Sequence, residues 1–225
     1  MSDSPAGDRY QVKFETLCLG NLDYRIRSLK DRQQFEDHDG AAHRLGITSA
    51  NWPLFGQVWP SGVILAEYMS GFACAGKRIL EIGCGLALSS LVLQRRGADI
   101  TASDLHPLAA SFLSENLRLN RLDPIRFHVG DWGKSDPSLG DFDLIIGSDV
   151  LYERDQPAIL SRFIEQHSSR QVEVIIVDPD RGNRAPFNRA MDARGYARAE
   201  HRGAAHAHAA AYKGRILSYR RDLDA

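Results

Sequence analysis

Short apolar strands alternate with amphipathic helices from residue 77 to the C-terminus, and this alternation most limits the possible fold. Strands that are separated by helices of 10–15 residues predict an α/β fold: a parallel sheet with helices on both faces. The last two strands lack a full helix between them, so we expect them to pair antiparallel at one edge. The predicted strands are 78–82, 100–103, 125–129, 142–147, 172–177, 196–200 and 215–219, and the predicted helices 86–96, 107–119, 156–167 and 185–194.

The first third of the chain has a different pattern. Two alternating segments, 10–19 and 22–29, flank Gly20-Asn21 and predict a β-hairpin. A polar loop with a short helical turn over 31–50 and an aromatic, proline-rich segment over 51–60 follow. Ser61 is expected to cap a helix that ends near Gly71. The sequence therefore divides into an N-terminal extension, 1–75, and a core, 76–225.

Composition excludes several classes of protein. The chain has 225 residues and a net charge of -1, which argues against binding nucleic acid by bulk electrostatics. No apolar run approaches the ~20 residues of a membrane span, and the polar N-terminus does not resemble a signal peptide. Three cysteines without a C-x-x-C pair argue against a disulfide framework. The simplest location is the cytoplasm.

A glycine loop follows the first core strand in the segment Ile79-Leu-Glu-Ile-Gly-Cys-Gly85. Gly83 and Gly85 allow a tight turn and close approach of the backbone to a ligand. Leu88 stands where a dinucleotide fingerprint has its third glycine, which disfavours NAD. The chain has no G-K-[ST] sequence, so a phosphate-binding P-loop is not predicted.

Asp104 ends the second core strand, nineteen residues after Gly85. A carboxylate at this point is placed to accept hydrogen bonds from ribose hydroxyls. A glycine loop with such an acid and no phosphate-binding device suits a nucleoside without pyrophosphate, such as S-adenosylmethionine (SAM). The alternative is a tight turn and a helix-capping Asp, which the coincidence of the two features disfavours.

Asp131 and Trp132 follow the third core strand. An acid here can accept a hydrogen bond from an exocyclic amine, and an indole can pack on a purine face. Although a lone Trp after a strand more often packs in the core, this position favours contact with adenine.

Together these motifs resemble the class I, seven-β-strand SAM-dependent methyltransferases. Val58-Trp59, Asp131-Trp132 and the D-x-x-Y segment Asp149-Val-Leu-Tyr152 are similar to the protein-lysine methyltransferases that act on chaperones and on the electron-transfer flavoprotein β-subunit. The resemblance covers roughly residues 50–220. It implies a Rossmann-like, seven-stranded, mostly parallel sheet with an antiparallel last strand and an N-terminal hairpin extension.

The resemblance also implies site residues. Asp149 and Tyr152 match the catalytic pair that lines the substrate channel. Asp178-Pro-Asp-Arg-Gly182 resembles the flavoprotein-methylating branch, but the match is too short to fix the substrate. The implied SAM-binding residues are Trp59, Glu81, Gly83, Cys84, Gly85, Asp104, Leu105, Asp131, Trp132 and Ser148.

Methyl transfer to lysine needs an oriented, neutral amine. Asp149 is predicted to hold the incoming ammonium, and Tyr152 to hydrogen-bond it or cover it with its ring. The proton leaves to water, to Asp149 or through Tyr152. The structural alternatives are a turn cap for Asp149 and packing for Tyr152. Asp178 or Arg181 contacts the substrate backbone, or the segment only shapes a turn.

No metal site is predicted, because His201, His206 and His208 lack a carboxylate or cysteine at matching spacing. Residues 181–225 carry ten Lys and Arg against four Asp and Glu, so we expect a basic face that docks an acidic protein.

Three functions stay open at this point. The leading prediction is methylation of a protein lysine, with a protein as partner and no membrane. A second is methylation of a small molecule or a nucleic acid, although no N-P-P-Y motif is present to stack a flipped base. A third is an inactive SAM-binding scaffold.

Overall fold

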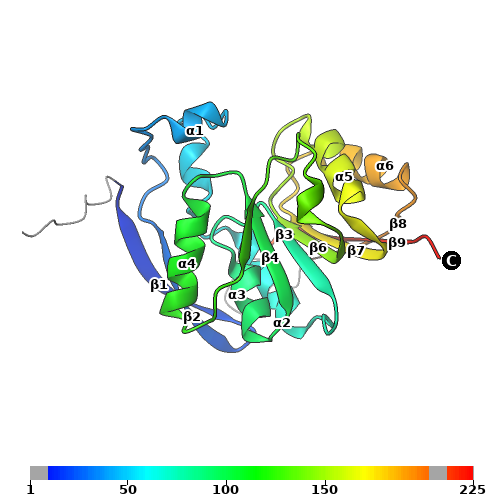
Figure 1. Ribbon diagram of the computed structural model, residues 1–225, viewed down its shortest axis with the longest axis horizontal. Coiled ribbons are helices and arrows are strands. Elements are labelled where there is room, and N and C mark those ends of the chain that lie inside the picture. Colours follow the sequence, from blue (N-terminus) through cyan, green and yellow to red (C-terminus); the bar gives the residue numbers. More distant parts are fainter. Residues whose placement is uncertain (1–9, 203–211, 225) are drawn as a thin grey trace, which may run out of the picture.

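The computed structural model of the protein describes residues 10–202 and 212–224 (Figure 1). Two strands form a separate sheet, and seven form the central one. The first pair is β1 (Val12–Leu19) and β2 (Leu22–Leu29). The central strands are β3 (Arg78–Ile82), β4 (Asp99–Asp104), β5 (Arg126–Val129), β6 (Phe142–Ser148), β7 (Ser168–Asp178), β8 (Ala197–Arg202) and β9 (Arg215–Asp222).

The helices alternate with the central strands, as the sequence predicts. Two short 3-10 turns, η1 (Trp52–Leu54) and η2 (Pro137–Leu139), lie in the connections. The α-helices are α1 (Ala41–Arg44), α2 (Pro60–Gly71), α3 (Leu88–Arg95), α4 (Ala109–Leu119), α5 (Gln156–Gln166) and α6 (Arg184–Asp192).

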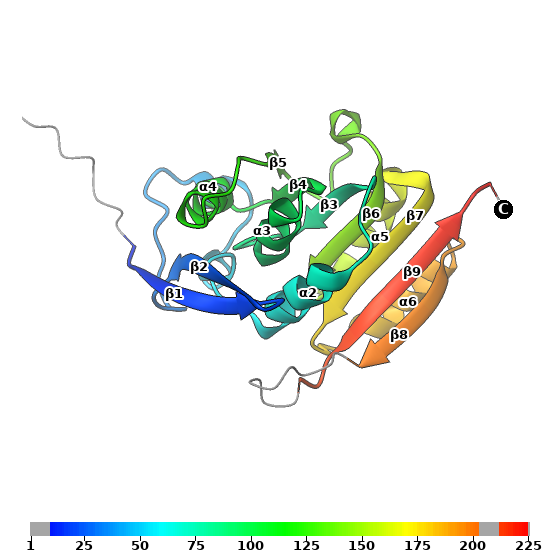
Figure 2. The same cartoon turned by 90° about the horizontal axis from the view of Figure 1, so that it is seen from below.

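The central sheet has the order β5-β4-β3-β6-β7-β9-β8 (Figure 2). Strands β3 to β7 run parallel, and β9 lies antiparallel between β7 and β8. The fold prediction and the antiparallel pairing of the last two strands are therefore confirmed. The chain runs from β3 toward β4 and β5, and then returns to β6 on the other side of β3. Ligands bind at such a switch point in open α/β sheets.

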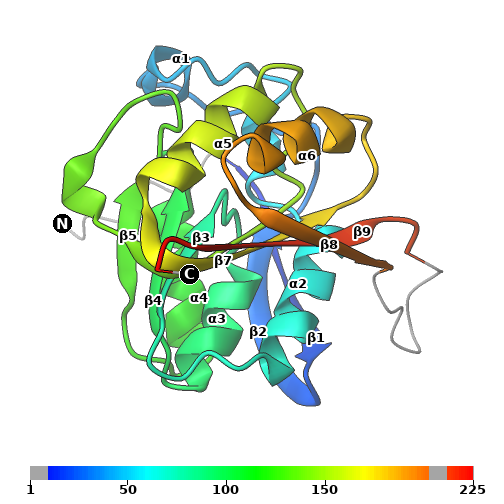
Figure 3. The same ribbon diagram turned by 90° about the vertical axis from the view of Figure 1, so that its right-hand side faces the viewer.

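Helices cover both faces of this sheet (Figure 3). On one face α5 and α6 bury Phe163, Ile164 and Phe187 against β6, β7 and β9. On the other face α2 buries Ile64 and Leu65 against β3, β6 and β7. Strands that are covered on both sides read as continuous apolar runs, which explains the pattern of the sequence.

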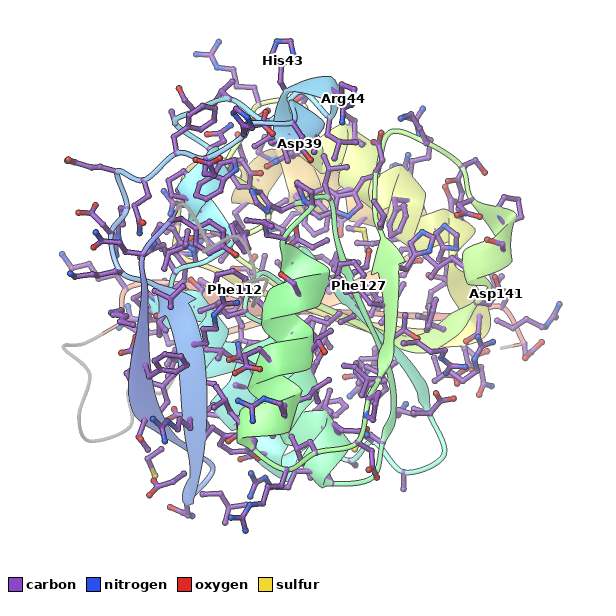
Figure 4. The ribbon with its side chains drawn as sticks, turned by 60° about the vertical axis from the view of Figure 1, so that its left-hand side comes forward. Asp39, His43, Arg44, Phe112, Phe127 and Asp141 are labelled. Atoms are coloured by element: carbon purple, nitrogen blue, oxygen red, sulfur yellow. The ribbon has the colours of Figure 1, made fainter. Side chains whose placement is uncertain are left out.

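The predicted hairpin is confirmed, and it docks on α4 (Figure 4). The Asn116 side chain accepts from the Arg27 N–H at 2.7 Å and donates to the Arg27 carbonyl. Asn120 repeats this arrangement with Arg25. The Arg27 guanidinium lies 4.2 Å from the centroid of the Phe112 ring. Two amides thus satisfy backbone groups at the edge of β2, and they fix the extension to the core.

One predicted detail is wrong, the cap of the helix before the central sheet. The helix α2 begins at Pro60 with Trp59 as its N-cap, so Ser61 is not the cap. The fixed φ of proline suits the first helical position, and the Ser61 hydroxyl instead hydrogen-bonds Tyr212 at 2.7 Å. The boundary near residue 75 stays a prediction, although α2, which was assigned to the extension, packs on the sheet. Within residues 10–202 and 212–224, no helix has the length and apolar content of a membrane span.

Candidate active site

The glycine loop connects β3 to α3 at the switch point. Gly83 and Gly85 have φ values of +55° and +52°, in the left-handed region that favours glycine. A Cβ on Gly85 would lie 2.8 Å from the carbonyl oxygen of Phe55. Only glycine therefore fits here, and the aromatic segment after β2 lies directly against the loop.

Gly83 brings two further segments together. A Cβ at this residue would lie 3.0 Å from Cγ1 of Val150 and 3.3 Å from the Trp132 ring. The chain after β5 and the chain after β6 therefore both reach the glycine loop. The structure thus places Trp132 beside the loop, while its contact with adenine stays a prediction.

Asp104, at the end of β4, holds the loop through its carboxylate. It accepts from the N–H of Gly85 and the N–H of His106, both at 2.8 Å. Within the described residues no cation pairs with it, and burial raises its pKa. The carboxylate keeps capacity to accept a further hydrogen bond. Leu105, the next residue, is half-buried beside it.

Glu81 and Cys84 lie under the loop. The Glu81 carboxylate accepts from the Ser90 N–H at 2.8 Å and from the Ser90 hydroxyl, which fixes the start of α3 to β3. Burial raises the pKa of Glu81 to about 7. Burial also raises the pKa of the Cys84 thiol, so this thiol stays neutral. Both side chains support the loop in this structure.

The aromatic segment closes one side of the site. Trp59 is half-buried and donates its indole N–H to the Leu54 carbonyl at 2.8 Å. Phe55 stacks on His106 with ring centroids 3.7 Å apart. The sequence prediction missed His106, whose only signal is its place two residues after Asp104. Burial lowers its pKa to about 3, so the ring is neutral.

Two more predicted residues have different surroundings. Asp131 accepts from the Gly133 N–H at 2.9 Å and pairs with Lys134 at 2.9 Å, so its carboxylate already has two partners in a turn. Ser148 ends β6, and a Cβ on Gly62 would lie 3.6 Å from its hydroxyl. The start of α2 therefore approaches the end of β6.

The D-x-x-Y segment follows β6. Asp149 has φ +55°, rare for a non-glycine residue, and its N–H donates to the Val177 carbonyl at 2.8 Å. Arg181 donates two hydrogen bonds to the two Asp149 oxygens, at 2.6 and 2.7 Å. The sequence prediction gave Arg181 a contact with substrate backbone or a place in a turn, and it missed this ion pair. Tyr152 is 47% exposed.

Asp178, at the end of β7, is buried with one oxygen unpartnered. Its Oδ2 accepts from the Asp180 N–H at 2.9 Å, while Oδ1 has no partner among the described residues. Burial raises the pKa of Asp178. Burial also raises the pKa of Tyr212 to about 12. The ends of β6 and β7 thus bring together three acids, Asp149, Asp178 and Asp180, and two arginines, Arg181 and Arg184.

The expected basic face of residues 181–225 is largely compensated. Most of its paired arginines contact acids outside this stretch, such as Glu165 and Glu173, whereas Arg198 pairs with Asp192 and Glu200 inside it. A local count of charges along the chain missed these partners, because pairing is set by contacts between distant elements. The paired arginines are Arg181, Arg184, Arg194, Arg198, Arg220 and Arg221.

A metal centre is not found in the part of the chain that the structure describes: no three His, Cys, Asp or Glu side chains there could hold an ion. His201 lies in β8. His206 and His208 lie outside the described residues.

The sheet order and the loop define a fold shared with SAM-dependent methyltransferases. The magnesium protoporphyrin IX methyltransferase (ChlM) of Synechocystis PCC 6803, solved with bound SAM, matches with a TM-score of 0.59 and 18% identity, over 85% of this chain and 100% of that one. The sequence profile described as lysine methyltransferase matches residues 49–188. This protein belongs to that lysine methyltransferase family.

Two relatives support the assignment. Protein N-lysine methyltransferase METTL21A of Xenopus tropicalis is 32% identical over 127 residues, or 53% of this chain and 58% of the relative. The electron transfer flavoprotein beta subunit lysine methyltransferase of Mus musculus is 29% identical over 133 residues, or 57% and 51%. The chain thus matches a little over half the length of these relatives.

The residues at the switch point fit SAM, the cofactor of this family. Asp104 can accept a further hydrogen bond from ribose hydroxyls, and Gly83 and Gly85 have no side chains that would keep a ligand from the loop backbone. The Trp132 ring lies against the loop where a purine face can pack.

Proposed function

We propose that this protein transfers a methyl group from SAM to the side-chain amine of a lysine in a protein substrate. The observation that carries the proposal is the placement of the D-x-x-Y segment beside the glycine loop, where Cγ1 of Val150 would lie 3.0 Å from a Cβ on Gly83. When bound, SAM supplies the methyl group on a sulfonium that acts as leaving group. The protein's own task is to bind and orient.

In this proposal seven of the predicted residues have a direct role. Asp104 holds the ribose, while Leu105 and Trp132 flank the adenine. Trp59 and Ser148 form the wall where α2 meets β6. Asp149 and Tyr152 face the incoming lysine. The partner is a protein in the cytoplasm, where the free cysteines Cys18, Cys74 and Cys84 stay reduced.

The test uses SAM with a tritiated methyl group and a lysate from a strain that lacks this protein. We expect one labelled protein band that yields methyllysine on hydrolysis. Label only in RNA, or only in small molecules, would support the second function. Label nowhere would support an inactive scaffold.

The D-x-x-Y segment is tested by Asp149→Ala in the same assay. The side chain of Asp149 is only 11% exposed and ion-paired, so its loss leaves Arg181 without its carboxylate. We expect labelling to fall by at least tenfold. Undiminished labelling would contradict the role assigned to Asp149.

A further inference from the structure

The pair formed by Asp149 and Arg181 is the starting point. The Arg181 Nε and Nη2 atoms lie 2.6 and 2.7 Å from the two Asp149 oxygens, which is the forked geometry that a guanidinium offers a carboxylate. The Arg181 side chain is 45% exposed, whereas that of Asp149 is 11% exposed. The Asp149 backbone is in the left-handed region and tied to β7, so the carboxylate is held from both ends.

The other charged groups around this pair are largely engaged elsewhere. On the β7 side, Asp180 pairs with Arg184 at 3.1 Å, and buried Asp178 acts on Arg181 through space. On the β9 side, Tyr212 is neutral because burial raises its pKa to about 12. After β6, Tyr152 carries no charge, and its neighbours Glu153 and Asp104 are acidic. Within the described residues, Arg181 is the cation in contact with Asp149.

This arrangement has a consequence for an amine nucleophile. A bare carboxylate stabilises an ammonium, and so it opposes formation of the neutral amine that attacks the methyl carbon. A carboxylate already paired with a guanidinium exerts a weaker field. Each of its oxygens still has a lone pair that can accept an amine N–H.

We propose that Arg181 is a positioning residue: it orients the Asp149 carboxylate and offsets its charge, so that a substrate lysine binds as the neutral amine after giving its proton to water. This inference rests on the proposed function. It adds a residue outside the D-x-x-Y segment to the substrate side of the site.

The kinetic test is Arg181→Gln, assayed with the purified protein from the labelled lysate band. The acidic limb of the kcat profile reports the ionisation of the bound lysine. In Arg181→Gln we expect this limb to lie about one pH unit higher, so that kcat at pH values below the limb falls about tenfold. Arg181→Lys keeps the charge and should restore the position of the limb. Arg220→Gln, which removes an exposed arginine paired with Glu173 at 2.9 Å, is the matched control and should leave the limb in place.

A second measurement does not depend on turnover. In the full-length protein, the side-chain Nε–H of Arg181 should give a slowly exchanging proton–nitrogen NMR signal, because it is hydrogen-bonded to Asp149. Asp149→Asn should bring this signal into fast exchange, and Arg220→Gln should not. A signal that is already in fast exchange in the wild type would overturn the inference.

The outcomes separate the two proposals. If the wild type methylates no lysine, the proposed function fails and the inference fails with it. If the wild type is active and Arg181→Gln is slower with an unmoved limb, Arg181 is only structural and the inference alone is wrong. A lower KM and a faster rate in Arg181→Gln would also overturn it, because Arg181 would then compete with the substrate.

Discussion

Two carboxylates flank the switch point, and they are held in opposite ways. Asp104, beside the glycine loop, accepts only from backbone N–H groups and has no cation partner among the described residues. Asp149, after β6, forms a bidentate ion pair with Arg181. The first is suited to neutral hydroxyl donors, and the second to a group that changes its charge. An aspartate is thus suited to bind neutral hydroxyls or a group that changes its charge, depending on the partners of its carboxylate.

The two sides also differ in rigidity. The proposed nucleoside side is built from buried backbone that cannot change without steric conflict, as Gly85 against Phe55 shows. The proposed substrate side is built from side chains, of which Arg181 and Tyr152 are nearly half exposed. We therefore expect mutations on the nucleoside side to affect both stability and SAM affinity, and mutations on the substrate side to affect mainly turnover.

The largest effect is expected for Gly85→Val. Its Cβ would meet the Phe55 carbonyl at 2.8 Å in a left-handed backbone, which costs about 4 kcal/mol in the free energy of unfolding. SAM affinity should fall at least a hundredfold in calorimetry. Gly97→Val is the control, because Gly97 has φ +73° but open space around it, so only the backbone strain applies. Equal effects at the two positions would contradict the steric argument.

Glu81→Gln should change the pH dependence of stability. Glu81 has a pKa of about 7 when folded against 4.5 as its ordinary value, so the folded state binds its proton more tightly. The wild-type free energy of unfolding should therefore fall by about 3 kcal/mol as pH rises from about 4.5 to 7. Urea denaturation across this range should show that Glu81→Gln lacks this fall. The control Glu15→Gln, on the hairpin, should keep the wild-type dependence of the free energy of unfolding on pH. If Glu81→Gln also kept it, the prediction would be refuted.

Asp104→Asn should weaken SAM binding by about 2 kcal/mol, or about thirtyfold, because it removes the charge from hydrogen bonds to hydroxyls. Calorimetry with SAM measures this. Asp149→Asn is the matched variant on the other side of the switch point and should change SAM affinity less than threefold. Equal losses in the two variants would remove the distinction between the two sides.

The smallest effect on stability is expected for Tyr152→Phe. Since Tyr152 is 47% exposed, the free energy of unfolding should change by less than about 0.5 kcal/mol. Loss of its hydroxyl should still slow labelling of the substrate about fivefold, as measured with tritiated SAM. An unchanged rate would leave Tyr152 with a packing role only.

The sequence predicted most of the fold, because strand and helix periodicities are local. The hairpin, the seven central strands and the Gly83–Gly85 loop all follow from short patterns. The cap of α2 was wrong, because Pro60 fits the first helical turn while Ser61 bonds a distant Tyr212. His106 was missed because its stacking on Phe55 joins two segments far apart in the chain.

The sequence by itself determined the order of strands and helices, the glycines that the loop requires and the acid at the end of β4. These depend on backbone geometry and on neighbours within a few residues. Only the tertiary structure decided which charges are paired. Arg181 pairs with Asp149, and Arg194 and Arg220 of the basic stretch near the C-terminus pair with the distant acids Glu165 and Glu173. Charge pairing depends on which strand ends meet at one edge of the sheet, and the local pattern of the chain does not record that.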